Sequence, residues 1–68
     1  MTTVGALLAE ARQRIPAGEA RLLLGHVLGR NAAWLEAHRD DQVAADRDYT
    51  ALVARREAGE PIPYLIGE

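Results

Sequence analysis

Two histidines are the first candidates for acid–base or metal chemistry in this 68-residue chain. His26 has Leu22 four residues before it and Arg30 four residues after it, so no second base or ligand lies at helical spacing. We therefore expect His26 on the polar flank of a helix. His38 falls where a helix should end, and we expect it to cap that helix or to hydrogen-bond a loop.

The remaining polar residues do not form a recognisable catalytic set. Asp40 and Asp41 are adjacent, so their carboxylates should point apart in a solvated loop. The chain has no cysteine or serine, and its threonines have no general base nearby in sequence, which leaves no nucleophile for triad chemistry. The glycines are spread along the chain, at the ends of predicted helices or singly inside them, and do not form a phosphate-binding loop. The sequence thus predicts no catalytic, cofactor-binding or metal-binding residue.

Charge and length restrict the function classes further. Sixty-eight residues allow one domain, and the net charge of −2 argues against attraction to nucleic acid or an anionic membrane. No apolar run approaches the ~20 residues of a membrane span. The first residues lack the basic flank and apolar stretch of a signal peptide. We expect a soluble cytoplasmic domain.

Helical periodicity predicts an all-α fold, a small antiparallel bundle of four helices with a short C-terminal helical turn. The first helix should be capped by Thr2 or Thr3 and stopped by Pro16. Its apolar stripe consists of Val4, Leu7, Leu8, Ala11 and Ile15. The second helix should open at Gly18, end at a left-handed Gly29 and be the most buried. Its apolar face consists of Ala20, Leu23, Leu24, Val27 and Leu28, widened by Leu22.

Two further helices are expected, with no strand pattern anywhere. Asn31 should cap a short helix from Ala32 to about His38 that presents Trp34 and Leu35, followed by a polar loop over 39–42. A last long helix should run from about Ala44 to Ala58, with Ala45, Tyr49, Leu52 and Val53 inward and Gly59 ending it. Gly5 and Gly25 fall inside helices, which indicates close approach of a neighbouring helix.

The last nine residues differ from the rest. Two prolines in three residues forbid a long helix, although Pro61 could occupy the first position of a single turn. The apolar residues that follow should pack on the bundle or on something beyond residue 68. We accordingly divide the chain into a bundle over 1–59 and a junction over 60–68. Arg55 and Arg56 could bind an anionic partner or could simply suit the helix dipole, and Trp34 and Tyr64 could be contact residues or core residues.

One segment is more specific than any of these features. The run from Arg55 to Glu68 resembles the R-R-x-x-G-E-P-[IL]-x-[YH]-[LI]-x-G signature of the HemK/PrmC family of release-factor glutamine methyltransferases. The E-A-x-x-L-L pattern that begins at Glu19, the V-L-G that begins at Val27 and the L-x-A-H that begins at Leu35 resemble the family as well. The likeness therefore extends over the whole chain.

This resemblance implies a two-part protein, in which a helical N-terminal domain precedes a Rossmann-like domain that binds S-adenosylmethionine. The N-terminal domain is implied to hold a class-1 peptide-chain release factor, whose Gly-Gly-Gln glutamine is the methyl acceptor. The family's Asn-Pro-Pro-Tyr motif and cofactor loop are not in this chain, so the cofactor belongs to the parent enzyme. The matching positions mark candidate contacts with the substrate or with the catalytic domain: Arg55, Arg56, Glu60, Pro61, Tyr64 and Gly67. The alternatives are a free-standing helical interaction module and a helix-turn-helix DNA binder, although this acidic chain lacks the basic face of a DNA binder.

Overall fold

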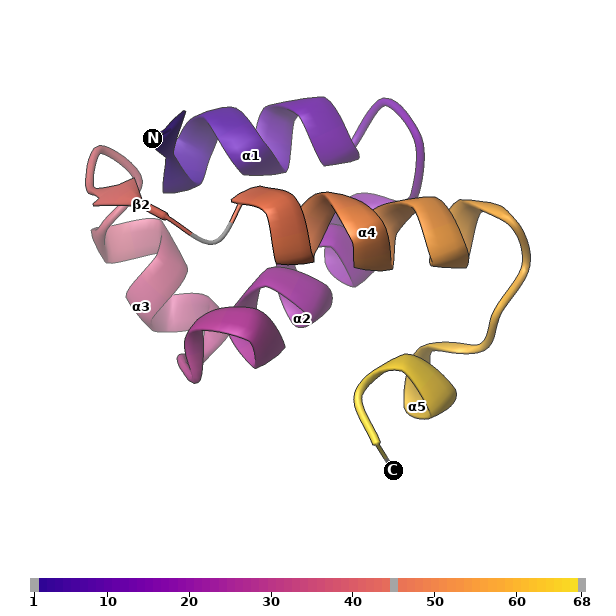
Figure 1. Ribbon diagram of the computed structural model, residues 1–68. Helices are drawn as coiled ribbons and strands as arrows, with labels where there is room; N and C mark the ends of the chain where they lie inside the picture. The colour runs from indigo at the N-terminus through magenta and orange to yellow at the C-terminus, as the bar shows by residue number, and fades with distance from the viewer. Residues whose placement is uncertain (1, 45, 68) are drawn as a thin grey trace.

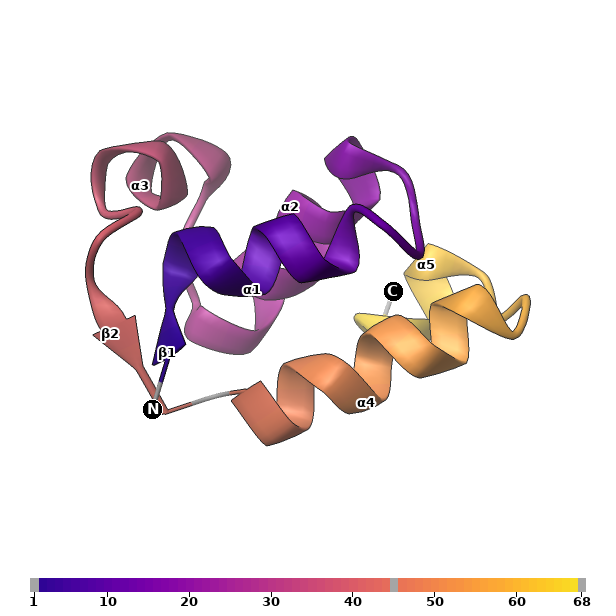
Figure 2. The same cartoon turned by 90° about the horizontal axis from the view of Figure 1, so that it is seen from above.

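The computed structural model describes residues 2–44 and 46–67, and within them the chain is a small helical domain (Figure 1). The helices are α1 (Val4–Ala11), α2 (Ala17–Leu28), α3 (Ala32–Ala37), α4 (Asp46–Glu57) and α5 (Ile62–Leu65), and two short strands, β1 (Thr2–Thr3) and β2 (Gln42–Val43), complete the fold. Helices α1 and α4 run in the same direction, and α2 runs in the opposite direction and packs against both (Figures 1 and 2). Because α2 packs against α1, α3, α4 and α5, it is the central helix, as predicted.

Helix α1 begins as expected but ends early. The Thr3 hydroxyl accepts a hydrogen bond from the Ala6 backbone N–H at 3.1 Å, which caps the helix. The helix ends at Ala11, before the predicted stop at Pro16, and turns carry the chain onward. Ile15 is nevertheless buried, so its place in the apolar stripe was right although its helical conformation was not.

Helix α2 confirms the predicted cap and corrects one predicted core residue. Gly29 has a φ of 69°, and its N–H and that of Arg30 bond back to the carbonyls of His26 and Gly25. These two hydrogen bonds form a Schellman motif, a helix end in which glycine is favoured at the left-handed position. Leu22 is 49% exposed, so the prediction that it widens the buried face was wrong. Leu23 and Leu24 already fill the inward side of this turn.

The segment after α2 contains the element that the sequence did not predict. Asn31 caps α3, its side chain accepting a hydrogen bond from the Trp34 N–H at 2.8 Å. After the polar turn, Gln42 and Val43 pair antiparallel with Thr3 and Thr2 and form a two-stranded sheet. Strands of two residues are too short to show alternation, so periodicity could not have revealed them.

The glycines inside α1 and α2 allow loops, rather than other helices, to approach. A Cβ atom on Gly25 would lie 2.5 Å from the Arg30 carbonyl oxygen, and one on Gly5 would lie 3.2 Å from that of Arg39. The predicted approach of a neighbouring helix is therefore wrong: Gly5 is approached by the loop that follows α3, and Gly25 by the backbone of the turn that ends α2 itself.

One apolar core joins the helices. It consists of Val4, Leu7, Leu8, Ala11, Ile15, Ala20, Leu23, Leu24, Leu35, Tyr49, Val53 and Leu65. In α4, Tyr49 and Val53 are buried and Leu52 is partly buried, in agreement with the predicted stripe. The predicted inward position of Ala45 lies outside the described residues. Trp34 is only partly buried, so on α3 it is Leu35 that belongs to the core.

Candidate functional site

The signature residues lie where α4 ends and the chain turns toward α5. Helix α4 ends in a second Schellman arrangement, in which Gly59 has a φ of 106° and its N–H bonds to the Arg56 carbonyl at 2.9 Å. The Glu60 N–H bonds to the Arg55 carbonyl at 3.2 Å. Because this conformation reverses the chain, it places Glu60 back beside the last turn of α4.

Arg55 and Glu60 are consequently close enough to pair. The Arg55 Nε and Nη2 atoms donate to the two Glu60 carboxylate oxygens at 2.9 and 2.8 Å. Such a two-pronged pair fixes orientation as well as distance. The Arg55 hydrogen bond holds the pKa of the Glu60 carboxyl below its ordinary value.

Arg56 connects three parts of the fold. Its Nε and Nη2 atoms donate to the Glu19 carboxylate in the first turn of α2, at 2.8 and 3.2 Å. Its Nη1 atom donates to the Glu60 backbone carbonyl at 3.1 Å. The Arg56 hydrogen bond lowers the pKa of Glu19. We call Glu19, Arg55, Arg56 and Glu60 the arginine clamp, because together they fix the start of the tail to α2 and α4.

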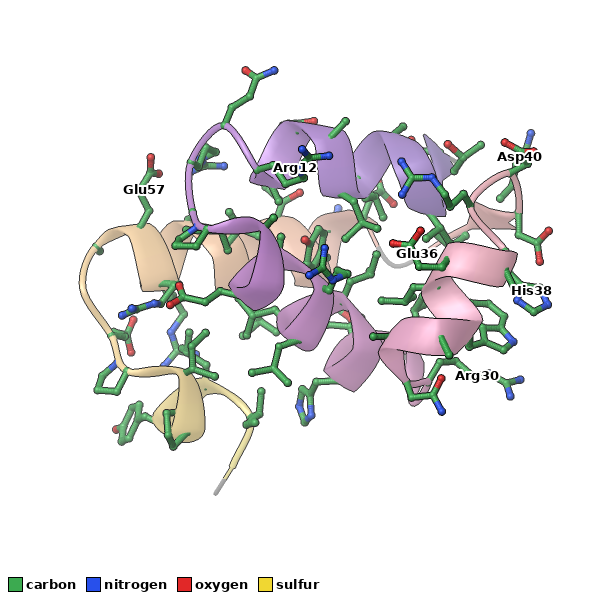
Figure 3. All side chains as sticks on the ribbon, turned by 180° about the vertical axis from the view of Figure 1, so that it is seen from behind. Arg12, Arg30, Glu36, His38, Asp40 and Glu57 are labelled. Atoms are coloured by element: carbon green, nitrogen blue, oxygen red, sulfur yellow. The ribbon has the colours of Figure 1, made fainter. Side chains whose placement is uncertain are left out.

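A third pair lies beside the arginine clamp. Arg14, in the turn after α1, donates from Nε and Nη2 to one Glu57 carboxylate oxygen at 3.0 and 2.7 Å. Glu57 is labelled in Figure 3 at the end of α4. The end of α4 is thus connected to the turn after α1 through Glu57, to α2 through Arg56 and to the tail through Arg55.

Apolar contacts hold the rest of the tail. Leu65 is buried, and Ile62 and Ile66 are partly buried against the same core, so the tail packs on the bundle. Pro61 precedes the first residue of α5 and occupies its cap position, one residue earlier than predicted. Tyr64 is 71% exposed, which excludes the core role considered for it.

The structure brings together three of the six candidate contact residues. Arg55, Arg56 and Glu60 form one network. Among the described residues the Tyr64 side chain makes no hydrogen bond, and Pro61 and Gly67 have no side-chain donor or acceptor. Gly67 has a φ of 82°, a conformation that favours glycine. The place of Glu19 in this network was not predicted, although Glu19 begins the E-A-x-x-L-L pattern that resembles the family.

The histidines lie apart from the arginine clamp. His26 is exposed on α2. His38 is at the C-terminal cap of α3, as expected, and its ring stacks on Trp34 with the ring centroids 4.1 Å apart. Its Nδ1 atom lies 2.8 Å from the Trp34 carbonyl oxygen, a contact that requires Nδ1 to carry the proton. Over the described ranges, no three acidic, histidine or cysteine side chains gather as a metal site would require.

The described helices are also short. None of them is both long and apolar enough to cross a lipid bilayer.

Comparison with known proteins gives one consistent family. The family model described as the PrmC N-terminal domain matches residues 2–67. A release factor glutamine methyltransferase of Bordetella pertussis is 49% identical over 98% of this chain and 25% of its own length. The enzyme of the same name from Xylella fastidiosa strain Temecula1 is 45% identical over 91% of this chain and 23% of its own length.

A third relative agrees with these two. The release factor glutamine methyltransferase of Burkholderia pseudomallei is 47% identical over 72% of this chain and 18% of its own length. The chain therefore spans about a quarter or less of the curated relatives it matches. No solved structure matches it significantly. The chain belongs to the PrmC N-terminal domain family.

Proposed function

We propose that this domain is the substrate-recognition part of a release factor glutamine methyltransferase. The observation that carries the proposal is the match of residues 2–67 to the PrmC N-terminal domain, together with relatives that carry that enzyme name. The matched segment of each relative is a quarter or less of its length, which leaves room for a separate catalytic domain.

In this proposal the work is divided between two domains. The catalytic domain binds S-adenosylmethionine and performs methyl transfer in the cytoplasm, where release factors act. The helical domain binds a class-1 release factor and contributes binding energy at a distance from the reacting glutamine. Such remote binding raises kcat/KM by positioning the acceptor group.

The arginine clamp supports a role for residues 60–68 as the junction between the domains. Arg55 and Arg56 are engaged by Glu60 and Glu19, which suits residues that fix the direction of the departing chain. Pro61 and Tyr64 are exposed, so they are available to contact the catalytic domain or the substrate.

A deletion in the parent enzyme tests the proposal. Removing residues 1–58 should leave S-adenosylmethionine binding intact, as measured by calorimetry, and should lower kcat/KM for the intact release factor. A short peptide containing Gly-Gly-Gln cannot reach this domain, so both forms should methylate it about equally. If the deletion abolished peptide methylation while cofactor binding persisted, the domain would belong to the active site and the proposal would be wrong.

A further inference from the structure

A large hollow among the described residues lies along the outer side of α2. It is an open groove of about 700 Å³, within the range of known ligand sites of about 300–1,000 Å³. Leu22 and Ile66 line it and supply apolar surface, Leu22 being 49% exposed. Large exposed apolar side chains that line a groove are typical of a docking surface.

The charges along this groove have one sign. Arg21 and Arg30 line it together with His26, and none of the described residues that line it is acidic. This is unexpected in a chain of net charge −2. The ion pairs found among the described residues employ other arginines: Arg14, Arg39, Arg55 and Arg56.

The two arginines have different surroundings. Arg21 lies in the middle of α2 and is half-buried. Arg30 follows the left-handed Gly29, and its guanidinium carbon lies 5.0 Å from the centroid of the Trp34 ring. Figure 3 shows Arg30 at the end of α2 nearest to α3. The contact with Trp34 holds the Arg30 guanidinium before a partner binds, which reduces the entropy lost on binding.

We infer that this groove binds an acidic, apolar-faced segment of the protein substrate, an inference that rests on the proposed function. Leu22 and Ile66 would contact the apolar side chains of that segment, and its carboxylates would pair with Arg21 and Arg30. Charge complementarity of this kind steers association and selects the partner. The release factor segment that docks here must therefore carry both acidic and apolar side chains.

The test compares charge reversal in the groove with charge reversal elsewhere. In the full enzyme, the double variant Arg21→Glu/Arg30→Glu should lower the ratio of kcat/KM for the intact release factor to that for a Gly-Gly-Gln peptide by about tenfold or more. Leu22→Ala should lower the same ratio by a smaller factor. Arg47→Glu, on the exposed first turn of α4, is the matched control and should leave the ratio unchanged. Thermal melts of all variants check folding.

Salt provides a second measurement. Added salt should lower the wild-type kcat/KM for the release factor, because it screens the groove charges, and should affect the double variant less. A wild-type ratio in the double variant would overturn the inference. An equal loss of kcat/KM with the release factor and with the peptide would also overturn it, because it would show that the groove is covered by the catalytic domain. If the wild-type enzyme did not methylate release factor at all, the proposed function would fail first.

Discussion

The Tyr49 hydroxyl of α4 donates a hydrogen bond to the Ala20 carbonyl of α2 at 2.9 Å, within the core. Tyr49 is 1% exposed and is the largest fully buried side chain, so this bond fixes the two helices against each other at their contact. Burial raises the pKa of Tyr49 to about 12, because the phenolate would lose its hydration.

Tyr49→Phe should therefore destabilise the domain modestly at neutral pH. The ring keeps its packing, and only the hydrogen bond is lost, which costs about 0.5–1.5 kcal/mol. Denaturant unfolding followed by circular dichroism measures the difference, and a loss above about 3 kcal/mol would show that the ring itself had been displaced.

The same residue should govern stability at alkaline pH. The pKa of Tyr49 is higher in the folded state than its ordinary value of 10.0, so its contribution is complete below pH 10 and is lost as pH rises toward about 12. Stability should fall over that interval in the wild type and less steeply in Tyr49→Phe. In a Tyr64→Phe variant Tyr49 is the one remaining tyrosine. The absorption of its phenolate should therefore appear together with unfolding. Ionisation near pH 10 without unfolding would contradict this account.

Glycine positions along α2 offer a matched pair of substitutions. Gly25→Ala would place a Cβ atom 2.5 Å from the Arg30 carbonyl oxygen, so the backbone must shift, at a cost of about 1–3 kcal/mol. Gly18 has nothing within 4 Å of such an atom, so Gly18→Ala should be neutral or should stabilise the helix by up to about 1 kcal/mol. In thermal melts Gly25→Ala should melt below the wild type, whereas Gly18→Ala should melt at or above it. Equal effects would refute the close approach.

The sequence predicted the features that depend on local chemistry. Thr3, Asn31 and Gly29 cap helices because each interaction involves residues near in sequence. The exposed position of Leu22 could not be predicted, because a helix with several adjacent leucines has more apolar residues than one contact face can bury. The β1–β2 pairing joins segments about forty residues apart through two residues each, and such a contact has no local signal.

In the candidate site, too, local features were predicted and contacts between distant segments were not. The C-terminal end of α4 was predicted closely, with Arg55 and Arg56 near the stop at Gly59, whereas the helix begins at Asp46, later than the predicted start near Ala44. The partners of the arginines were not predicted, because Glu19 is distant in sequence and Glu60 is brought back only by the left-handed Gly59. Sequence spacing could place Arg55 and Arg56 in the last turn of a helix, where they suit the helix dipole. The glutamates that pair with them come close only in the folded chain.

Trp34 and Leu35 should differ in their contribution to stability. Leu35 is fully buried, so Leu35→Ala should cost about 2–5 kcal/mol, a large share of the stability of a domain this small. Trp34 is partly exposed and lies against Arg30 and His38, so Trp34→Ala should cost less than Leu35→Ala. Urea midpoints of the two variants decide the order, and the reverse order would mean that Trp34 is the true anchor of α3.

The arginine clamp should release the tail in acid. Arginine hydrogen bonds hold the pKa values of Glu19 and Glu60 below their ordinary 4.5 in the folded state. Their contribution is therefore present above pH 4.5 and is lost as pH falls through the lower folded values. Protonation leaves Arg56 with weaker acceptors, so α5 should loosen before the core unfolds.

Hydrogen exchange can separate tail release from global unfolding. The Leu65 amide bonds to the Pro61 carbonyl, and its protection should fall below pH 4.5 and also, at neutral pH, in Glu19→Gln. Arg56→Lys should have a similar effect, because lysine keeps the charge but cannot bridge Glu19 and the Glu60 carbonyl in one plane. Arg39→Gln is the control, since its 3.6 Å pair with Glu36 lies on the exposed surface and should contribute little. If Leu65 stayed protected while the core amides of α2 lost protection first, the arginine clamp would not hold the tail, and the apolar contacts of Leu65 alone would explain its position.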